Sequence, residues 1–188
     1  MVNLNVATRR GTVLNGALFS APGKADVLVI AITGIHGNFY SNPFYYDIGD
    51  ALNAAGIDFA YAQTRNAFGV IRTRNVLTKK EEVIGSWNER FADTDEDIAA
   101  YLDEAERRGY RHIVLAGHSL GANKVVYYLS RHHDSRVEHF ILMSPANVDY
   151  MTSGVTREER EIVAALMAEG KGGEIAPTGK KWRRVDGG

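Results

Sequence analysis

The chain has 188 residues, 45% hydrophobic and 24% charged, which fits one globular domain and excludes a disordered or fibrous protein. Its formal net charge of -1 gives no electrostatic basis for binding nucleic acid or a membrane surface. The lack of cysteine excludes disulfides, thiolate metal sites and thiol catalysis. The sequence shows neither a signal peptide at its start nor an apolar run that spans a bilayer, so we expect a cytoplasmic protein.

Predicted strands alternate with predicted helices over the first 143 residues. The sequence predicts an antiparallel hairpin over 2–8 and 12–19, followed by strands over 26–33, 57–63, 112–117 and 137–143. It predicts helices over 41–55, 94–108 and 121–131. We expect Ser41 to cap the first helix, and Thr94 and Asp97 to form a capping box on the second. This alternation indicates an α/β fold, a three-layer sandwich in which helices cover both faces of a mostly parallel sheet.

Two stretches depart from that pattern. Residues 64–87 are expected to form a long irregular connection, whose Arg65, Arg72 and Arg74 either receive an anionic substrate group or form a solvated basic loop. A helix capped by Thr156 is expected over 156–169, and the residues after it are loop-like. We therefore divide the chain into a core over 1–150 and a region over 151–188 that holds this helix and a loop-like tail.

The strongest chemical signal is Gly117-His118-Ser119-Leu120-Gly121, a G-x-S-x-G motif between a predicted strand and a predicted helix. That context places Ser119 on a sharp, strained turn from which its hydroxyl projects as a nucleophile. The N–H of Leu120, at the start of the helix, is then placed to stabilise an oxyanion. The alternative is a glycine-rich turn whose serine only caps the helix.

A second oxyanion donor is expected from the loop over residues 33–38, which follows an earlier strand. Gly34 permits a tight turn, so we assign the second donor to the N–H of Ile35, with His36 and Asn38 at the rim of the substrate site. The alternative is a phosphate-binding loop, but Asn38 and Tyr40 occupy positions where a dinucleotide fingerprint requires glycine.

These segments together resemble the α/β-hydrolase superfamily. Residues 26–38 match its third strand and oxyanion loop, 57–69 its fourth strand region, and 117–121 its nucleophile elbow. The resemblance covers about the first 150 residues, which hold six of the family's usual eight strands, and it places a partial cap over 156–169. It implies a serine hydrolase of the esterase, lipase or thioesterase kind, which acts on a small-molecule acyl substrate without a cofactor.

The resemblance also implies a catalytic acid and then a histidine after Ser119. The last of the six histidines is residue 139, and the spacing of metal ligands is absent as well. Asp149 is a candidate acid, or else a solvated loop carboxylate. His36 is the histidine on a loop at the expected edge of the sheet, where it contacts substrate or acts as the base. Either the chain is truncated before its acid and histidine, or it is a catalytically incompetent hydrolase-like binding domain.

The expected truncation has a structural consequence. If the sheet ends at its sixth strand, apolar side chains of 137–143 and of the last helix are expected to be exposed. We expect such an uncovered edge to favour self-association.

Overall fold

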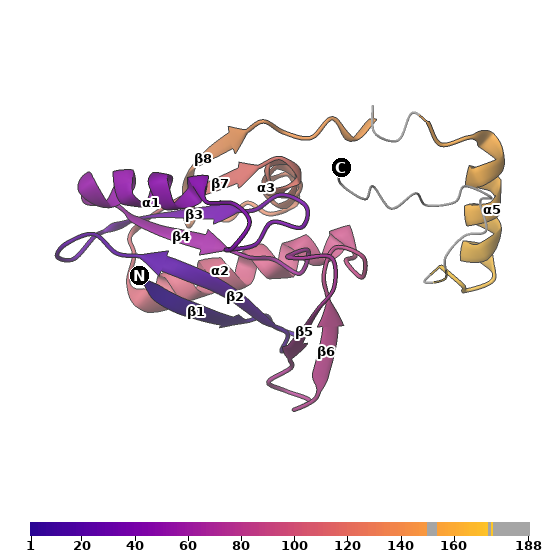
Figure 1. Cartoon of the computed structure of the whole chain (residues 1–188), viewed down its shortest axis with the longest axis horizontal. Coiled ribbons are helices and arrows are strands. Elements are labelled where there is room, and N and C mark those ends of the chain that lie inside the picture. Colours follow the sequence, from indigo (N-terminus) through magenta and orange to yellow (C-terminus); the bar gives the residue numbers. More distant parts are fainter. Residues whose placement is uncertain (150–153, 173, 175–188) are drawn as a thin grey trace. The chain divides into compact units, whose positions relative to one another are not determined.

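The computed structural model describes residues 1–149, 154–172 and 174, and it divides into two compact units, Met1–Ala146 and Asn147–Gly188. The first unit contains a six-stranded sheet with the strand order β1-β2-β4-β3-β7-β8 (Figure 1). Its strands are β1 (Val2–Ala7), β2 (Val13–Phe19), β3 (Val27–Ile32), β4 (Asp58–Ala62), β7 (His112–His118) and β8 (Val137–Met143). Its helices are α1 (Phe44–Ala54), α2 (Thr94–Arg108) and α3 (Leu120–Arg131), with a short 3-10 helix, η1 (Phe91–Asp93), before α2.

The sheet is antiparallel at one end and parallel over the rest. β2 pairs antiparallel with both β1 and β4, which confirms the predicted hairpin. β4, β3, β7 and β8 run parallel to one another. The loops after β3 and β7 therefore leave the same edge of the sheet, which is where ligands bind in open α/β sheets.

Helices cover both faces of the central strands, as predicted. Alternate residues of β3 point to opposite faces, so Ile30 and Ile32 pack in a cluster with α2 and α3. Val29 and Ala31 pack in the other cluster, with α1. Figure 1 shows α1 on one side of the sheet and α2 on the other. The fold is the predicted α/β three-layer sandwich.

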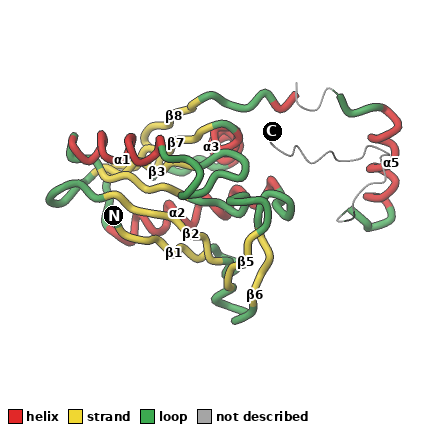
Figure 2. Tube along the Cα trace, in the orientation of Figure 1, coloured by secondary structure: helices red, strands yellow, loops and turns green. Residues whose placement is uncertain are grey.

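Residues 64–87 form a long connection between β4 and η1, as predicted, but the connection is not irregular throughout. The chain there forms an antiparallel pair of short strands, β5 (Ile71–Arg74) and β6 (Glu81–Ile84), visible as a separate arm in Figure 2. The Asn75 side chain shapes the turn between them, because its Oδ1 accepts from the N–H groups of Leu77 and Thr78, at 2.9 Å each. Four-residue strands that carry several charged side chains give little hydrophobic periodicity, which is why the sequence pattern did not reveal them.

Two predicted helix caps are wrong, although α2 spans the predicted residues 94–108. Helix α1 begins at Phe44, after Pro43, and Ser41 lies outside it. In α2 the N-cap residue is Asp93, which makes no side-chain capping bond, and Thr94 is the first helical residue. The Asp97 carboxylate accepts instead from the backbone N–H of Arg65, at 2.8 Å. Because the Asp97 carboxylate is hydrogen-bonded to Arg65, it does not form a capping box with Thr94.

The second unit contains helix α5 (Arg157–Ala168), and Thr156 caps it as predicted. The Thr156 hydroxyl accepts from the N–H of Glu159 at 3.2 Å, and the Glu159 carboxylate accepts from the N–H of Thr156 at 2.7 Å. Most of the predicted tail lies outside the described residues. In the part of the chain that is described, no helix has both the length and the apolarity to cross a membrane.

Strand β8 exposes the apolar side chains that the sequence led us to expect. Phe140 is 59% exposed, Ile141 48% and Leu142 37%, and in α5 Val163 and Met167 are exposed as well. Among the described residues β8 pairs with β7 alone. The exposure of this strand is confirmed, whereas self-association through it stays a prediction.

Candidate active site

Ser119 occupies the turn between β7 and α3 in a backbone conformation that few side chains adopt. Its φ is 53° and its ψ is −126°, outside the allowed regions for most residues. Its N–H donates to the carbonyl of Met143 at 3.0 Å, and its own carbonyl accepts from the N–H of Ala122 at 3.0 Å. The predicted strained turn is therefore present, and hydrogen bonds on both sides of the residue hold it in place.

The glycines that flank Ser119 are required because other backbone passes close to them. A Cβ atom added to Gly117 would lie 2.5 Å from the carbonyl oxygen of Gly121. One added to Gly121 would lie 2.2 Å from the carbonyl oxygen of Ile32, at the end of β3. Neither distance is tolerable for a side-chain carbon, so both positions need glycine for the turn to pack against β3.

The loop after β3 lies directly against Ser119, as predicted. The parallel register pairs Ile32 with Gly117, so Gly34, two residues on, comes beside Ser119. A Cβ atom on Gly34 would lie 3.0 Å from the Cβ and 3.5 Å from the Oγ of Ser119. Ile35 follows with a side chain that is 51% exposed. The structure thus brings together the two segments from which the sequence predicted oxyanion donors.

Asn38 holds the loop in shape from within. Its side chain is buried, donates from Nδ2 to the carbonyl of His36 at 3.0 Å, and accepts at Oδ1 from the N–H groups of Tyr40 (3.0 Å) and Ser41 (3.1 Å). These bonds give Asn38 a structural role in the loop. Contact with a substrate stays a prediction for this residue.

His36 faces a serine that sequence reasoning missed. Its Nδ1 lies 2.7 Å from the Oγ of Ser86, and its carbonyl accepts from the N–H of Phe68 at 3.3 Å. His36 also has a positive φ of 57°. Ser86 is fifty positions away in a region predicted to be irregular, so no sequence signal could have paired the two. The loop beside Ser119 is thereby tied to the arm that carries β5 and β6.

The other five histidines contact side chains other than Ser119 or are exposed. His112 is 2.8 Å from the Glu138 carboxylate, His132 is 3.3 Å from that of Asp95, and His133 and His139 are exposed. The ring of His118 packs edge-on against Phe44, with the centroids 5.2 Å apart. None of the hydrogen bonds of the described residues joins a histidine to the Ser119 hydroxyl.

A buried ion pair lies behind the turn. Lys124, on the first turns of α3, is fully buried, and its Nζ contacts the carboxylate of Glu89 and the hydroxyl of Thr64, the latter at 3.1 Å. Close by, burial raises the pKa of Asp97 to about 6, against the opposing effect of the Arg65 guanidinium. Arg65 is thus buried and paired, so it neither receives a substrate anion nor belongs to a solvated loop. Sequence reasoning assigned no role to Lys124 or Glu89.

Asp149, the candidate acid, belongs to the second unit, Asn147–Gly188, and its side chain is exposed. The structure does not test its role. No group of three or more His, Asp or Glu side chains suited to a metal ion occurs among the described residues.

Comparisons with known proteins identify the fold. A sequence model of a family described as alpha/beta hydrolase fold matches residues 28–188. A search of the curated proteins found no match. Among similar solved structures is the alpha/beta hydrolase GrgF from a Penicillium species, 16% identical with a TM-score of 0.61, over 89% of this chain and 55% of that one. Another is Est1E from Butyrivibrio proteoclasticus, 19% identical with a TM-score of 0.62, over 83% of this chain and 56% of that one.

An esterase from Pyrococcus furiosus is also similar, 14% identical with a TM-score of 0.60, over 93% of this chain and 62% of that one. At such identities the likeness shows the fold alone. The chain spans 55 to 62% of the lengths of these three structures.

Proposed function

Because this chain belongs to the alpha/beta hydrolase fold family, we propose that it is a serine hydrolase of ester or thioester bonds with Ser119 as its nucleophile. The observation that carries the proposal is the positive φ of Ser119 between β7 and α3, with Gly34 packed against its side chain. A serine held there projects its hydroxyl from the carboxyl edge of the sheet, where a substrate can reach it.

The N–H groups of Ile35 and Leu120 are proposed to form the oxyanion hole. Leu120 begins α3, so the positive end of the helix dipole adds to its N–H. Neither N–H takes part in the hydrogen bonds that hold the described residues together, which leaves both able to donate to a substrate. Removing one such donor typically lowers kcat by about 10² to 10³.

The chemistry is a two-step acyl transfer. The Ser119 Oγ attacks the carbonyl carbon, the carbonyl oxygen becomes the oxyanion, and collapse expels the alcohol or thiol, which takes up a proton. Water then attacks the acyl-serine, releasing the carboxylic acid and restoring the hydroxyl. Both steps need a base beside Ser119, and the histidines of the described residues do not supply one. We therefore expect weak turnover, in which an unactivated Ser119 attacks slowly and the oxyanion hole stabilises the transition state.

The placement of the histidines also favours a second candidate function, a hydrolase-like binding domain without catalysis. All six histidines lie among the described residues, and the one on the loop beside Ser119 is hydrogen-bonded to Ser86. In that case the site binds an acyl compound and leaves it intact.

Hydrolysis of p-nitrophenyl acetate and of a matched thioester by the purified chain tests the proposal. We expect Ser119→Ala to lower the rate at least about tenfold, because the attack is lost. Ser130→Ala, which alters an exposed serine on the same helix, is the control and should leave the rate unchanged. Equal rates for the chain and Ser119→Ala would support the binding domain instead. Turnover that depends on both Ser119 and His36 would show that the base is present after all.

A further inference from the structure

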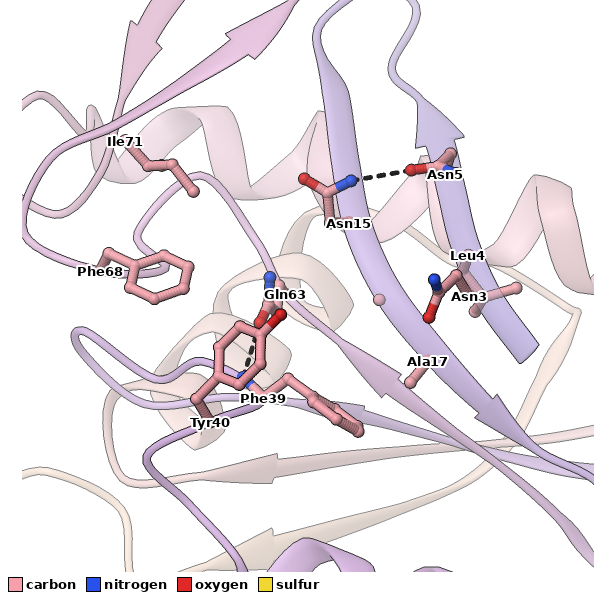
Figure 3. Close-up of a pocket in the computed structure, with 11 residues that line it drawn as sticks. Asn3, Leu4, Asn5, Asn15, Ala17, Phe39, Tyr40, Gln63, Phe68 and Ile71 are labelled. Carbon is pink, nitrogen blue, oxygen red and sulfur yellow. Dashed lines mark hydrogen bonds between the residues drawn. The ribbon is translucent and has the colours of Figure 1, made fainter. Parts of the chain in front are cut away.

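A cavity of about 250 Å³ opens on the antiparallel end of the sheet, and neither Ser119 nor Gly34 lines it (Figure 3). β1 and β2 form its floor, while the loop after β3 and the segment before β5 supply its walls. Ligand pockets for drug-sized molecules occupy about 300 to 1,000 Å³, so this cavity suits a smaller molecule, about one ring in size.

The floor carries asparagine side chains on strands. The register pairs Asn5 with Asn15 and Asn3 with Ala17, so these side chains share one face of the sheet, opposite the core residue Leu4. Asn15 Nδ2 donates to Asn5 Oδ1 at 2.8 Å, which leaves the Oδ1 of Asn15 and the Nδ2 of Asn5 to a ligand. Asparagine is disfavoured in strands, and the single bond between Asn5 and Asn15 leaves most of the amide groups around the cavity without a partner from this pair of strands.

A buried glutamine adds a fixed donor. Gln63, at the end of β4, is only 7% exposed, and its Oε1 accepts from the N–H of Phe39 at 2.6 Å. That bond sets the orientation of the amide, so its Nε2 carries two N–H groups that no hydrogen bond of the described residues uses. Figure 3 shows this nitrogen turned toward the space between Asn15 and Phe68. Such a donor is satisfied by a water or by a ligand.

The walls are aromatic, and the lining contains no charged residue. Tyr40 is 82% exposed, and its ring meets that of Phe39 edge-on, with the centroids 5.9 Å apart. Phe68 faces them from the segment before β5. Because the amides both donate and accept and no charge is present, the site matches a neutral molecule with several hydroxyl groups and an apolar face that a ring can cover.

We propose that this cavity binds one neutral pyranose ring, whose hydroxyls bond the amides of Gln63, Asn15 and Asn5 and whose apolar face lies on Tyr40. The ring is either a sugar carried by an ester substrate or a separate saccharide. Tyr40 follows the loop that packs against Ser119, so both sources are compatible with the fold. The inference does not depend on Ser119 being a nucleophile.

Titration with methyl glucoside, methyl xyloside and methyl mannoside, followed by the side-chain amide signals in ¹⁵N NMR spectra, tests the site. We expect saturable binding of at least one glycoside, with a Kd of about 1 to 10 mM, and shifts of the Gln63 and Asn15 side-chain signals. Cyclohexanemethanol, an apolar ring of similar size, should not bind. No saturation by about 100 mM glycoside, or equal binding of the apolar ring, would overturn the proposal.

Three variants locate the binding. Gln63→Glu keeps the acceptor for the Phe39 N–H but removes the free donors, so we expect the Kd to rise at least about tenfold. Tyr40→Ala and Asn15→Ala change exposed residues, keep the fold, and should each weaken binding about threefold or more. Trp87→Ala and Asn88→Ala, exposed residues outside the cavity, should bind as before. Unchanged binding in Tyr40→Ala and Asn15→Ala would overturn the proposal even if Gln63→Glu fails to fold.

A final titration separates the two sources. An O-acetylated methyl glycoside is added to Ser119→Ala, which cannot hydrolyse it by serine attack. Binding at least about tenfold tighter than that of the plain glycoside assigns the ring to an ester substrate, and equal binding assigns it to a separate saccharide. Because binding and not turnover is measured, failure of this proposal is distinguishable from failure of the proposed hydrolase function.

Discussion

The turn at Ser119 and the arm, which comprises residues 64–93 and carries β5 and β6, are held in place by different forces. At the turn, backbone packs on backbone: Gly117 and Gly121 leave room for strand β3, and the strain at Ser119 is carried by main-chain hydrogen bonds. The arm is held by side chains from other parts of the fold. It is joined to α2 through Arg65 and Asp97, 3.0 Å apart, and to α3 through Glu89 and Lys124.

The difference teaches where substitutions matter. In the turn any added atom collides with the main chain, whereas in the arm the loss of one charge leaves its partner buried and unpaired. Helix α3 belongs to both regions, because it begins beside Ser119 and carries Lys124. The comparison therefore predicts separate kinds of damage from changes only a few residues apart on one helix.

The largest effect on stability is expected at the buried ion pair. Lys124→Met leaves the Glu89 carboxylate, 8% exposed, without its cation, which should lower the free energy of unfolding by about 3 to 5 kcal/mol. Lys124→Met combined with Glu89→Leu should recover most of that loss, because no charge is then stranded. Unfolding in urea measures the free energy of unfolding of the single and of the double variant.

The matched control for that pair is on the surface of the same arm. Arg72 and Glu81 form an ion pair at 3.0 Å with both side chains about 70% exposed, so Arg72→Met should cost less than about 0.5 kcal/mol. Similar losses for Lys124→Met and Arg72→Met would contradict the idea that buried charge holds the arm.

A smaller loss is expected in the turn. Gly121→Ala places a Cβ 2.2 Å from the carbonyl oxygen of Ile32, and the shift this forces should cost about 1 to 3 kcal/mol. Hydrolysis of p-nitrophenyl acetate should fall with it, because the strand and the nucleophile move apart. Gly154→Ala, where an added Cβ meets nothing within 4 Å, should change neither quantity. An unchanged free energy of unfolding for Gly121→Ala would contradict this, because it would show that the turn can move to make room for the Cβ.

The smallest effect concerns the far end of α3 and depends on pH. Hydrogen bonds from Arg136 hold the pKa of Asp134 well below its usual range, and Tyr128 donates to it as well. A depressed pKa adds stability above the unfolded pKa of about 3.9, and that stability is lost as the pH falls toward the folded pKa. Thermal unfolding should therefore show Asp134→Asn to be less stable than the unaltered chain at pH 6, with the gap closing from pH 5 to pH 2. A gap that stays constant with pH would contradict this.

The sequence predicted local features well wherever one segment carried the whole signal. The run over 26–33 gave a strand buried on both faces, and the glycines around Ser119 gave the sharp turn. Thr156 capped its helix as predicted, because its partner Glu159 lies three residues further along the same segment. The capping box predicted for Thr94 and Asp97 is wrong, because the Asp97 carboxylate accepts a hydrogen bond from the N–H of Arg65 instead.

The arm and the amide cavity could not be predicted, because their partners are far apart along the chain. His36 meets Ser86, Lys124 meets Glu89, and Gln63 is oriented by Phe39. A polar side chain gives no sign in the sequence of which distant group will satisfy it once both are buried.

The sequence by itself thus determined the alternation of strands and helices, the strained serine and the loop that lies beside it. Each of these follows from hydrophobic periodicity or from the conformational freedom of glycine, which act over a few residues. Only the tertiary structure decided which charges are buried together, what ties the loop beside Ser119 to the arm, and where an uncharged cavity opens. Those outcomes depend on burial, which brings distant groups into one environment and makes an unpaired polar atom costly.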